Sequence, residues 1–413
     1  MTNIAVNNWQ ELEARYMLQT IKRYPITLVK GKGARVWDDQ GKEYLDFIAG
    51  WAVNCLGHCH PVTIESLTRQ AQELIHASNQ FYTPQQIKLA QLLAENSALD
   101  RAFFQNSGAE ANEAAIKLAR KYGKLHLGGA YEVITTLRSF HGRTLSMVAA
   151  TGKPEYQEAY QPVPAGFPNV EYNNIEAIKA ATTDKTCAVM VEPIQAEGGV
   201  NVPAPDYLRK LRQWCDEKGL LLILDEVQTG IGRTGTMFAY EQAGIEPDVM
   251  TLAKGIGGGF PIGAILAKER ASVFEPGDHG STFGGNPLGC AVAYDTFCYV
   301  RDNDIPGNAR RVGNYLMSRL NDLKSEFPFI SEVRGRGLLV ALEFDREIAR
   351  DVVNVCIEEG LLLNAVKPTA LRFMPPLIIT NSEVDEAVGI LEKALPKFQN
   401  SGKEPKDGEQ VGP

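Results

Sequence analysis

The stretch LLLILDEVQTGIGRTG, residues 220–235, decides how this chain folds. Five aliphatic residues lead without alternation into Asp225, a pattern typical of a strand buried on both faces of a sheet. Further strands of this character, separated by helical patterns such as 109–122 and 205–218, are expected at 102–106, 131–137, 187–192, 248–252 and 262–267. Short apolar strands that alternate with helices predict an α/β fold with a mostly parallel sheet.

The pattern changes near residue 305, which predicts a second, smaller α+β domain. Its expected elements are helices at 307–325, 346–359 and 381–398 and strands within 333–344 and 371–377. Residues 29–47 resemble a hairpin with DDQG at its turn, and we expect the N-terminal segment to pack with this domain. The predicted division is therefore 1–50 with the small domain, 51–304 as the large domain, 305–398 as the C-terminal small domain, and 399–413 as a disordered tail.

Composition excludes several classes of protein. The 413 residues include 42 Lys+Arg and 50 Asp+Glu, a net charge of −8, which argues against a dedicated nucleic-acid binder. The seven cysteines form no CxxC pair, a pattern typical of reduced thiols in a cytosolic protein. No signal peptide is recognisable, and no apolar run approaches the ~20 residues of a membrane helix. We expect a cytoplasmic protein without membrane partners.

Residues that follow the strands carry the strongest functional signal, because ligands of open α/β sheets bind at the carboxyl ends of the strands. Asp225 ends a strand expected to be dry, and an unpaired buried charge costs on the order of several kcal/mol, so it needs a cationic partner. A protonated pyridine nitrogen would serve, although an Asp that only caps the next turn is an equal alternative.

Lys254 also ends an expected strand and precedes Gly255-Ile256-Gly257-Gly258-Gly259. Most lysines are solvated surface residues. At this position, however, residues without side chains would let a planar ligand approach, and loss of solvent would lower the lysine pKa toward nucleophilicity. Lys254 is therefore a candidate for a Schiff base with a carbonyl ligand.

Two more stretches favour an anionic, planar ligand. Ser107 and Glu110 form the pattern of a capping box, and the junction Ser107-Gly108-Ala109 would also expose N–H groups at the positive end of a helix. Phe140 offers a flat aromatic surface, and Arg143, three residues later, offers a bidentate binder for a carboxylate.

Two competing motifs are weaker. Residues 230–235 match G-x-G-x-x-G, which would indicate a dinucleotide-dependent oxidoreductase, but four residues separate the first glycine from Asp225. The stretch His58-Cys59-His60 has no second cluster to complete a metal site, so we expect no metal.

Taken together, these motifs resemble the class III pyridoxal-phosphate aminotransferases of fold type I. The similarity runs from Gly31 to Phe373 and is concentrated in LGHCHP (56–61), NSGAEANEAAIKLAR (106–120), FHGRTLS (140–146), EPIQAEGGV (192–200), LDEVQTGIGRTG (224–235), LAKGIGGGFPIGA (252–264) and GSTFGGNPLGC (280–290). The resemblance implies a large pyridoxal-phosphate-binding domain and a small domain formed from both ends of the chain.

The resemblance also implies a role for each matching residue. The candidate catalytic residues are Lys254 as the Schiff-base lysine, Asp225 as the partner of the pyridine nitrogen, and Glu197 as a gate near Arg372. The remaining cofactor-binding candidates are Ser107, Gly108, Ala109, Phe140, Val227, Gln228 and Thr282. The substrate-binding candidates are Arg143, Ser281, Arg372 and Trp51. Because Ser281 and Thr282 would reach the partner's site, a homodimer is implied.

Within the family, the motifs are most similar to enzymes that act on N-acetylornithine. The implied reaction moves its distal amino group to 2-oxoglutarate, a cytoplasmic step of arginine biosynthesis. Trp51 and Ala196 depart from common residues of those enzymes, so ornithine, succinylornithine, acetyl-lysine or 4-aminobutyrate remain alternative donors, and an aminomutase remains an alternative activity. Outside the family, the alternatives are an oxidoreductase and a non-catalytic protein that interacts through its acidic surface.

Overall fold

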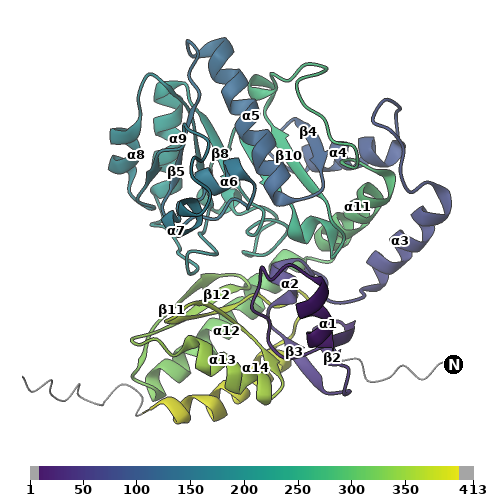
Figure 1. Ribbon diagram of the computed structural model, residues 1–413, viewed down its shortest axis with the longest axis vertical. Coiled ribbons are helices and arrows are strands. Elements are labelled where there is room, and N and C mark those ends of the chain that lie inside the picture. The colour runs from purple at the N-terminus through teal and green to yellow at the C-terminus, as the bar shows by residue number, and fades with distance from the viewer. Residues whose placement is uncertain (1–8, 400–413) are drawn as a thin grey trace, which may run out of the picture.

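The computed structural model describes residues 9–399 and has a seven-stranded sheet in its larger part, shown in the upper half of Figure 1. The strand order is β4-β10-β9-β8-β7-β5-β6. Only β10 runs antiparallel to its neighbours, so the predicted α/β fold with a mostly parallel sheet is confirmed. The strands are β4 (Arg101–Gln105), β5 (Glu132–Thr136), β6 (Asn169–Val170), β7 (Thr186–Val191), β8 (Leu221–Asp225), β9 (Val249–Leu252) and β10 (Gly263–Ala267).

Strand β8 shows why an apolar run without alternation forms a central strand. Leu221 and Ile223 belong to the core cluster that includes the alanine face of helix α5 (Gly108–His126). Leu222 and Leu224 belong to the cluster that includes Leu211 of helix α9 (Tyr207–Lys218). Both faces of β8 are therefore buried, and every residue of the strand has to be apolar until the chain reaches the sheet edge at Asp225.

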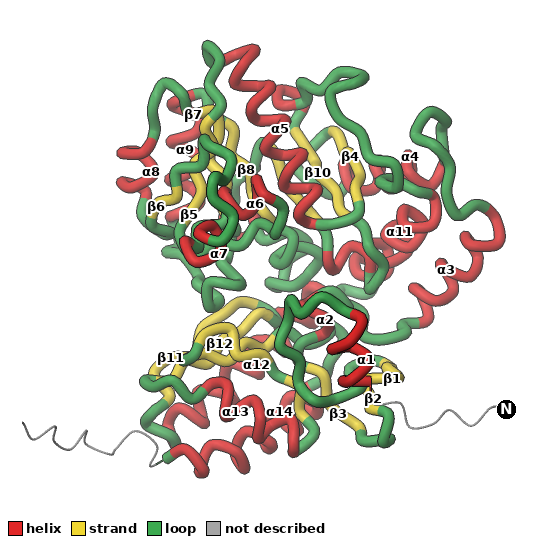
Figure 2. The backbone as a smooth tube through the Cα atoms, viewed as in Figure 1, coloured by secondary structure: helices red, strands yellow, loops and turns green. Residues whose placement is uncertain are grey.

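Helices surround the sheets, and Figure 2 shows them against the strands and loops. In the larger part they are α3 (Pro61–Glu73), α4 (Pro84–Glu95), α5, α6 (Leu145–Ala150), α7 (Pro154–Glu158), α8 (Ile175–Ala181), α9, α10 (Tyr240–Ala243) and α11 (Pro287–Asp302), with short 3₁₀ turns η1 (Lys254–Gly257) and η2 (Glu269–Ala271). The others are α1 (Trp9–Tyr16), α2 (Ala49–Ala52), α12 (Ile305–Glu326), α13 (Ala349–Glu358), α14 (Asn381–Ala394) and η3 (Leu395–Phe398). No helix among residues 9–399 has the length and apolar character needed to cross a membrane.

Segments from near both ends of the chain, within residues 28–46 and 330–373, lie side by side in the lower half of Figure 1. One four-stranded sheet has the order β1-β2-β3-β13, and its last pair joins β3 near the N-terminus to β13 near the C-terminus. A second, antiparallel sheet has the order β11-β12-β15-β14. The strands are β1 (Leu28–Lys32), β2 (Arg35–Asp38), β3 (Glu43–Asp46), β11 (Ile330–Arg336), β12 (Leu339–Phe344), β13 (Leu361–Leu362), β14 (Asn364–Lys367) and β15 (Ala370–Phe373).

This pairing supports a division of the chain into a small domain, made from 1–50 and 305–398, and a large domain, 51–304, and we propose that division. The hairpin expected within 29–47 is present, because β2 and β3 pair antiparallel around the predicted turn. Of the tail expected at 399–413, residues 400–413 lie outside the described part of the chain.

Candidate active site

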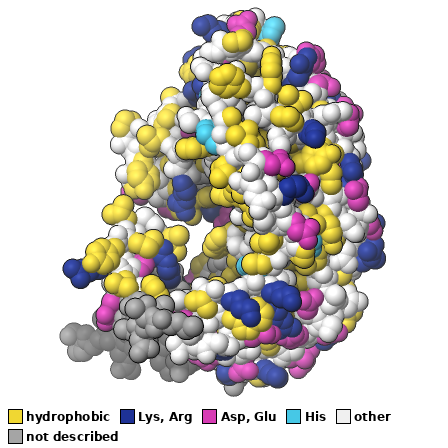
Figure 3. All heavy atoms as spheres, turned by 90° about the vertical axis from the view of Figure 1, so that its right-hand side faces the viewer, with side chains coloured by type: hydrophobic (Ala, Val, Ile, Leu, Met, Phe, Trp, Pro, Cys, Tyr) yellow, Lys and Arg dark blue, Asp and Glu magenta, His cyan; other side chains and the backbone are white. Residues whose placement is uncertain are grey.

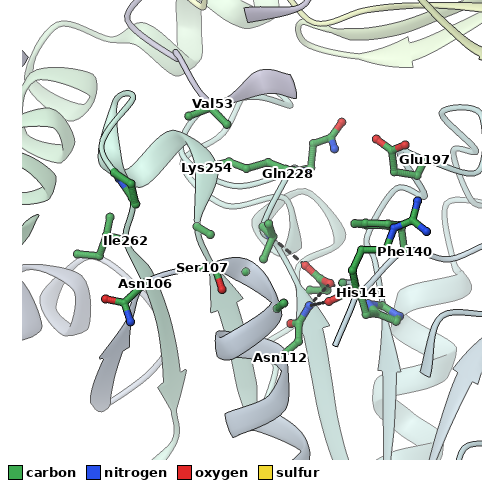
Figure 4. Close-up of a pocket in the computed structure, with 18 of the residues that line it drawn as sticks. Val53, Asn106, Ser107, Asn112, Phe140, His141, Glu197, Gln228, Lys254 and Ile262 are labelled. Atoms are coloured by element: carbon green, nitrogen blue, oxygen red, sulfur yellow. Dashed lines mark hydrogen bonds and ion pairs between the residues drawn. The ribbon is translucent and has the colours of Figure 1, made fainter. Parts of the chain in front are cut away.

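A cavity of about 470 Å³ lies at the carboxyl edge of the large sheet and faces the small domain (Figure 4). Strand β10 runs opposite to its neighbours, so its beginning rather than its end lies at this edge. The residues just before β10, which are Phe260, Pro261 and Ile262, therefore form part of the cavity wall. The predicted site residues that line the cavity are Ser107, Gly108, Ala109, Phe140, Arg143, Glu197, Asp225, Val227, Gln228 and Lys254. Residues from the ends of five strands therefore meet in one place.

Asp225 lies buried at the bottom of the cavity and is held from two sides. Its Oδ2 accepts hydrogen bonds from Asn112 Nδ2 at 2.8 Å and from His141 Nδ1 at 2.7 Å, and its Oδ1 accepts one from the backbone N–H of Val227 at 3.0 Å. Figure 4 shows these contacts converging on the carboxylate. The orientation of Asp225 is therefore fixed before any ligand binds.

His141 is the buried hydrogen-bond partner of Asp225. Complete burial opposes protonation of its ring, but the hydrogen bond and the charge of Asp225 outweigh burial and raise the pKa of His141 above its ordinary value. Its Nε2 is buried and has no hydrogen-bond partner among residues 9–399. The His141 ring therefore holds the Asp225 carboxylate in place from behind.

The first turn of α5 forms an anion cradle beside Asp225. Ser107 caps the helix, since its Oγ accepts from the backbone N–H of Glu110. Gly108 and Ala109 are the first helical residues, so their N–H groups have no acceptor within the helix, and both residues line the cavity. A Cβ on Gly108 would lie 2.9 Å from Val227 Cγ1, so only glycine lets the helix end approach Val227 this closely.

Lys254 follows β9 and is the first residue of η1. Its backbone has φ +45°, a conformation that is costly for a residue with a side chain and that directs the amine into the cavity. Burial lowers the pKa of the Lys254 amine, although the negative charge of Glu197 partly offsets this effect. A larger fraction of the amine is therefore uncharged and nucleophilic at neutral pH.

Glu197 and Arg372 form an ion pair of 2.6 Å next to Lys254. Arg372 is fully buried, and Gln228 Oε1 and Asn364 Oδ1 also accept from its guanidinium. Its Nη2 is buried without an acceptor among the described residues, so the pair leaves the two N–H groups of this nitrogen free for a carboxylate. Burial disfavours the charge of Glu197, but Arg372 and Lys254 outweigh burial and lower the pKa of Glu197.

Four predicted residues do not line the cavity of the single chain. Arg372 donates a hydrogen bond to Glu197, which does line the cavity. Trp51 is half exposed, and the centre of its ring lies 5.3 Å from Arg372 Cζ. Ser281 Oγ accepts a hydrogen bond from Asn106 Nδ2 at 3.2 Å, outside the cavity. Thr282 is exposed on the surface.

Arg143 is exposed at the mouth of the cavity and stacks on aromatic rings. Its Cζ lies 3.8 Å from the centre of the Tyr156 ring and 5.6 Å from that of Phe140. Sequence reasoning predicted Phe140 but missed Tyr156, which lies 13 residues after Arg143 in the separate helix α7. The two rings hold the guanidinium at one position.

Replacing Tyr156 with leucine is expected to raise the KM for a carboxylate-bearing donor about two- to fivefold with little change in kcat, because an exposed cation–π contact contributes about 0.5–1 kcal/mol. Steady-state kinetics measure both constants. Tyr156→Phe is the matched control and should behave as the wild type, since it keeps the ring. If Phe and Leu have equal effects, the stack does not position Arg143.

Three further residues that line the cavity were not predicted as site residues from the sequence: Asn112, His141 and Glu192. Asn112 stands one helical turn after Gly108 and so faces the same side, a spacing that could have identified it. His141 and Glu192 belong to stretches quoted above, but no role was predicted for them. Their function depends on which strands are neighbours, because Asp225 ends β8, whereas His141 and Glu192 follow β5 and β7.

Comparisons with known proteins agree with this geometry. The family described as aminotransferase class-III matches residues 16–395. Acetylornithine aminotransferase of Caldanaerobacter subterraneus is 51% identical over 388 residues, 94% of this chain and 99% of the relative. The protein of that name from Methanocaldococcus jannaschii is 49% identical over 95% of this chain and 99% of its own length.

Solved structures of aminotransferases superpose on this chain along most of its length. An ornithine aminotransferase from Toxoplasma gondii superposes with a TM-score of 0.91 at 37% identity and covers 95% of each chain. An N-acetylornithine aminotransferase from Stenotrophomonas maltophilia superposes with a TM-score of 0.81 at 37% identity, over 94% of this chain and 98% of that chain.

Proposed function

Because this chain belongs to the class-III aminotransferases, we propose that it transfers the distal amino group of N-acetylornithine to 2-oxoglutarate, giving N-acetylglutamate semialdehyde and glutamate. The observation that carries this proposal is the ion pair between Glu197 and Arg372 beside Lys254, together with the exposed Arg143 at the cavity mouth. The pair allows one cavity to accept both a substrate with a carboxylate next to the reacting amine and a substrate without one.

Class-III aminotransferases use pyridoxal phosphate, and the residues of the cavity fit that group. The buried Asp225 carboxylate, fixed by Asn112 and His141, suits a protonated ring nitrogen. The free N–H groups of Gly108 and Ala109 suit a phosphate, and Phe140 and Val227 are placed to flank a flat ring. When bound, pyridoxal phosphate withdraws electrons from the carbon that carries the amino group.

The chain's own residues would then perform three tasks. Lys254 would attach the cofactor and, once released, move a proton to and from the reacting carbon of the substrate. Asp225 would keep the ring nitrogen protonated, with Asn112 and His141 holding that carboxylate in place by hydrogen bonds. The apolar side chains of Val53, Phe260 and Ile262 line the same cavity and would exclude water from the reacting atoms.

The two arginines would handle the two substrates differently. Arg143 would bind the single carboxylate of N-acetylornithine, while Glu197 keeps Arg372 neutralised. With glutamate, Glu197 would move aside so that the free donor of Arg372 can bind the α-carboxylate, and Arg143 would bind the distal one. This exchange is needed because an unpaired buried charge is costly.

Replacing Glu197 with alanine is expected to speed the glutamate half-reaction relative to the N-acetylornithine half-reaction, by about tenfold in the ratio. Loss of Glu197 leaves Arg372 permanently available for an α-carboxylate and unpaired when N-acetylornithine is bound. Single-turnover spectra with each donor measure the ratio. An equal loss for both donors would show that Glu197 only braces its loop.

We also propose that the protein is a homodimer with shared active sites. Phe81, Tyr82 and Phe283 are 69%, 95% and 62% exposed, and Phe283 lies in the same loop as Ser281 and Thr282. Asn79 Nδ2 donates to the carbonyl oxygens of Ser281 and Gly284, so the two exposed loops form one unit. Figure 3 shows hydrophobic side chains gathered on this face of the molecule, and apolar surface of this kind marks an interface.

A shared site predicts complementation between inactive chains. Mixing Lys254→Ala chains with Thr282→Ala chains should recover activity, because one site of each heterodimer then has neither defect. Mixing Lys254→Ala with Asp225→Asn should recover none, since both residues line the cavity of one chain. Absence of recovery in the first mixture, after subunit exchange is verified by mass spectrometry, contradicts a site shared through Thr282.

The choice of donor is tested by a steady-state panel with 2-oxoglutarate as acceptor. N-acetylornithine should give the highest kcat/KM, above ornithine, N-succinylornithine, N-acetyllysine and 4-aminobutyrate. Trp51 stacks against Arg372 at the edge of the site, so Trp51→Tyr should alter the ratio between N-acetylornithine and ornithine. A higher kcat/KM for another donor in the wild-type protein would overturn the substrate assignment and leave the family unchanged.

A further inference from the structure

Glu192 connects two loops of the active site through one side chain. It follows β7, is 5% exposed and lines the cavity. Its Oε2 accepts a hydrogen bond from the backbone N–H of Phe140 at 3.1 Å, and its Oε1 accepts one from the backbone N–H of Ala196 at 3.2 Å. The first loop follows β5, and the second follows β7.

These loops carry the residues that would contact the cofactor and the substrates. Phe140 is a wall of the cavity, and the next residue, His141, bonds to Asp225. Ala196 directly precedes Glu197, which pairs with Arg372. A shift of either N–H group relative to Glu192 would therefore change the distance between the aromatic wall and the acidic side chain that governs Arg372.

The chemistry of this contact requires a carboxylate. Two N–H groups need two acceptors, and among side chains of this length only Glu supplies both, because Gln offers one acceptor and one donor. Burial raises the pKa of Glu192 to about 7, and the nearby Asp225 adds to the effect, against His141. A buried carboxylate is costly, and the raised pKa shows that the nearby His141 and the two backbone hydrogen bonds only partly offset the burial of Glu192.

We propose that Glu192 is a positioning residue that holds Phe140 and Glu197 at a fixed separation, and that selection between the two amino donors depends on it. The role of Glu192 in donor selection rests on the proposed aminotransferase function, whereas its role in holding Phe140 and Glu197 apart does not. The loop after β7 keeps other anchors when Glu192 is changed, since Gln195 Nε2 donates to Leu137 O at 2.8 Å and Tyr172 Oη donates to Pro193 O at 3.0 Å.

Glu192→Gln is the direct test, read first by hydrogen–deuterium exchange of the full chain with and without pyridoxal phosphate. The peptide containing Phe140 or the one containing Ala196 should exchange about tenfold faster, because one of the two N–H groups loses its acceptor. With cofactor bound, the visible circular dichroism should change, and the ratio of glutamate to N-acetylornithine half-reaction rates should shift about three- to tenfold.

Glu226→Gln is the matched control. Glu226 is also a buried carboxylate that accepts two backbone hydrogen bonds, from Ala239 at 2.7 Å and from Tyr240 at 2.8 Å, but it does not line the cavity. Its replacement should speed exchange near 239–240 and leave the donor ratio as in the wild type. Should Glu192→Gln fail to fold, Glu192→Asp keeps both acceptors but is too short to reach both loops, and the same changes are expected of it.

Two outcomes overturn the proposal. One is unchanged exchange at both Phe140 and Ala196. The other is faster exchange with an unchanged donor ratio and dichroism, which would reduce Glu192 to a structural brace. If the wild-type protein itself shows no transamination, the proposed function fails, and the exchange data still decide whether Glu192 holds the two loops.

Discussion

Replacing Lys254 with alanine is expected to reduce turnover by roughly 10⁴-fold or more while the chain still binds pyridoxal phosphate. The amine is buried in the cavity, where it would both attach the cofactor and move the substrate proton. The contacts assigned to the phosphate and the ring nitrogen come from Gly108, Ala109 and Asp225, which the substitution does not touch. The protein should therefore keep bound cofactor but lose its covalent link.

Borohydride reduction of the wild-type protein followed by peptide mapping measures that link directly and should label Lys254. Lys268→Ala is a suitable control, because this lysine lies just after β10, at the opposite edge of the sheet, and pairs with Glu246. It should retain wild-type activity and labelling. A label on any lysine other than Lys254 would contradict the assignment.

Replacing Asp225 with asparagine is expected to lower kcat/KM by on the order of 10²–10³-fold, the range seen when one preorganised electrostatic contact is removed. The amide keeps the shape of the side chain but cannot hold a proton on the ring nitrogen as a counter-charge. It also offers one acceptor where the carboxylate accepts from Asn112, His141 and Val227. Kinetics and the absorbance of the bound cofactor measure the effect.

Asn112→Ala shows how much of the effect of Asp225 on catalysis depends on its orientation rather than on its charge. Asn112 donates one of the hydrogen bonds to Asp225 but carries no charge, so its loss should cost less than the loss of the carboxylate, about tenfold. Thermal melting of each variant checks that the fold is retained. An Asp225→Asn protein within tenfold of wild-type kcat/KM would show that the carboxylate is not the partner of the ring nitrogen.

The sequence predicts the parts of the site that lie at strand ends. Asp225 is recognisable because a run of apolar residues ends at it, and Lys254 is recognisable because it ends an expected strand and precedes a glycine-rich stretch. The pattern from Ser107 to Glu110 marks the start of a helix. Strand periodicity cannot reveal contacts between strands, so the support of Asp225 by His141 and the bridge formed by Glu192 emerge only when β5, β7 and β8 lie next to each other.

The small domain's contribution is harder to predict from local pattern. Arg372 lies in β15, 144 residues beyond Gln228, and only the resemblance pointed to it. Its place beside the cavity depends on the packing of two domains, to which the fully buried Arg233 contributes by donating to the carbonyl oxygens of Leu338 and Pro375. Tyr156 was missed for a similar reason, since its role depends on a contact with Arg143 that forms only in the folded chain.

The transfer of nitrogen itself tests the central proposal most directly. The cofactor-loaded protein is given N-acetylornithine labelled with ¹⁵N at the distal amine, together with unlabelled 2-oxoglutarate, and the products are identified by mass spectrometry. We expect ¹⁵N in glutamate and equimolar N-acetylglutamate semialdehyde. Glutamate without ¹⁵N, or no glutamate from N-acetylornithine under conditions in which another amino donor reacts, would contradict the proposed function.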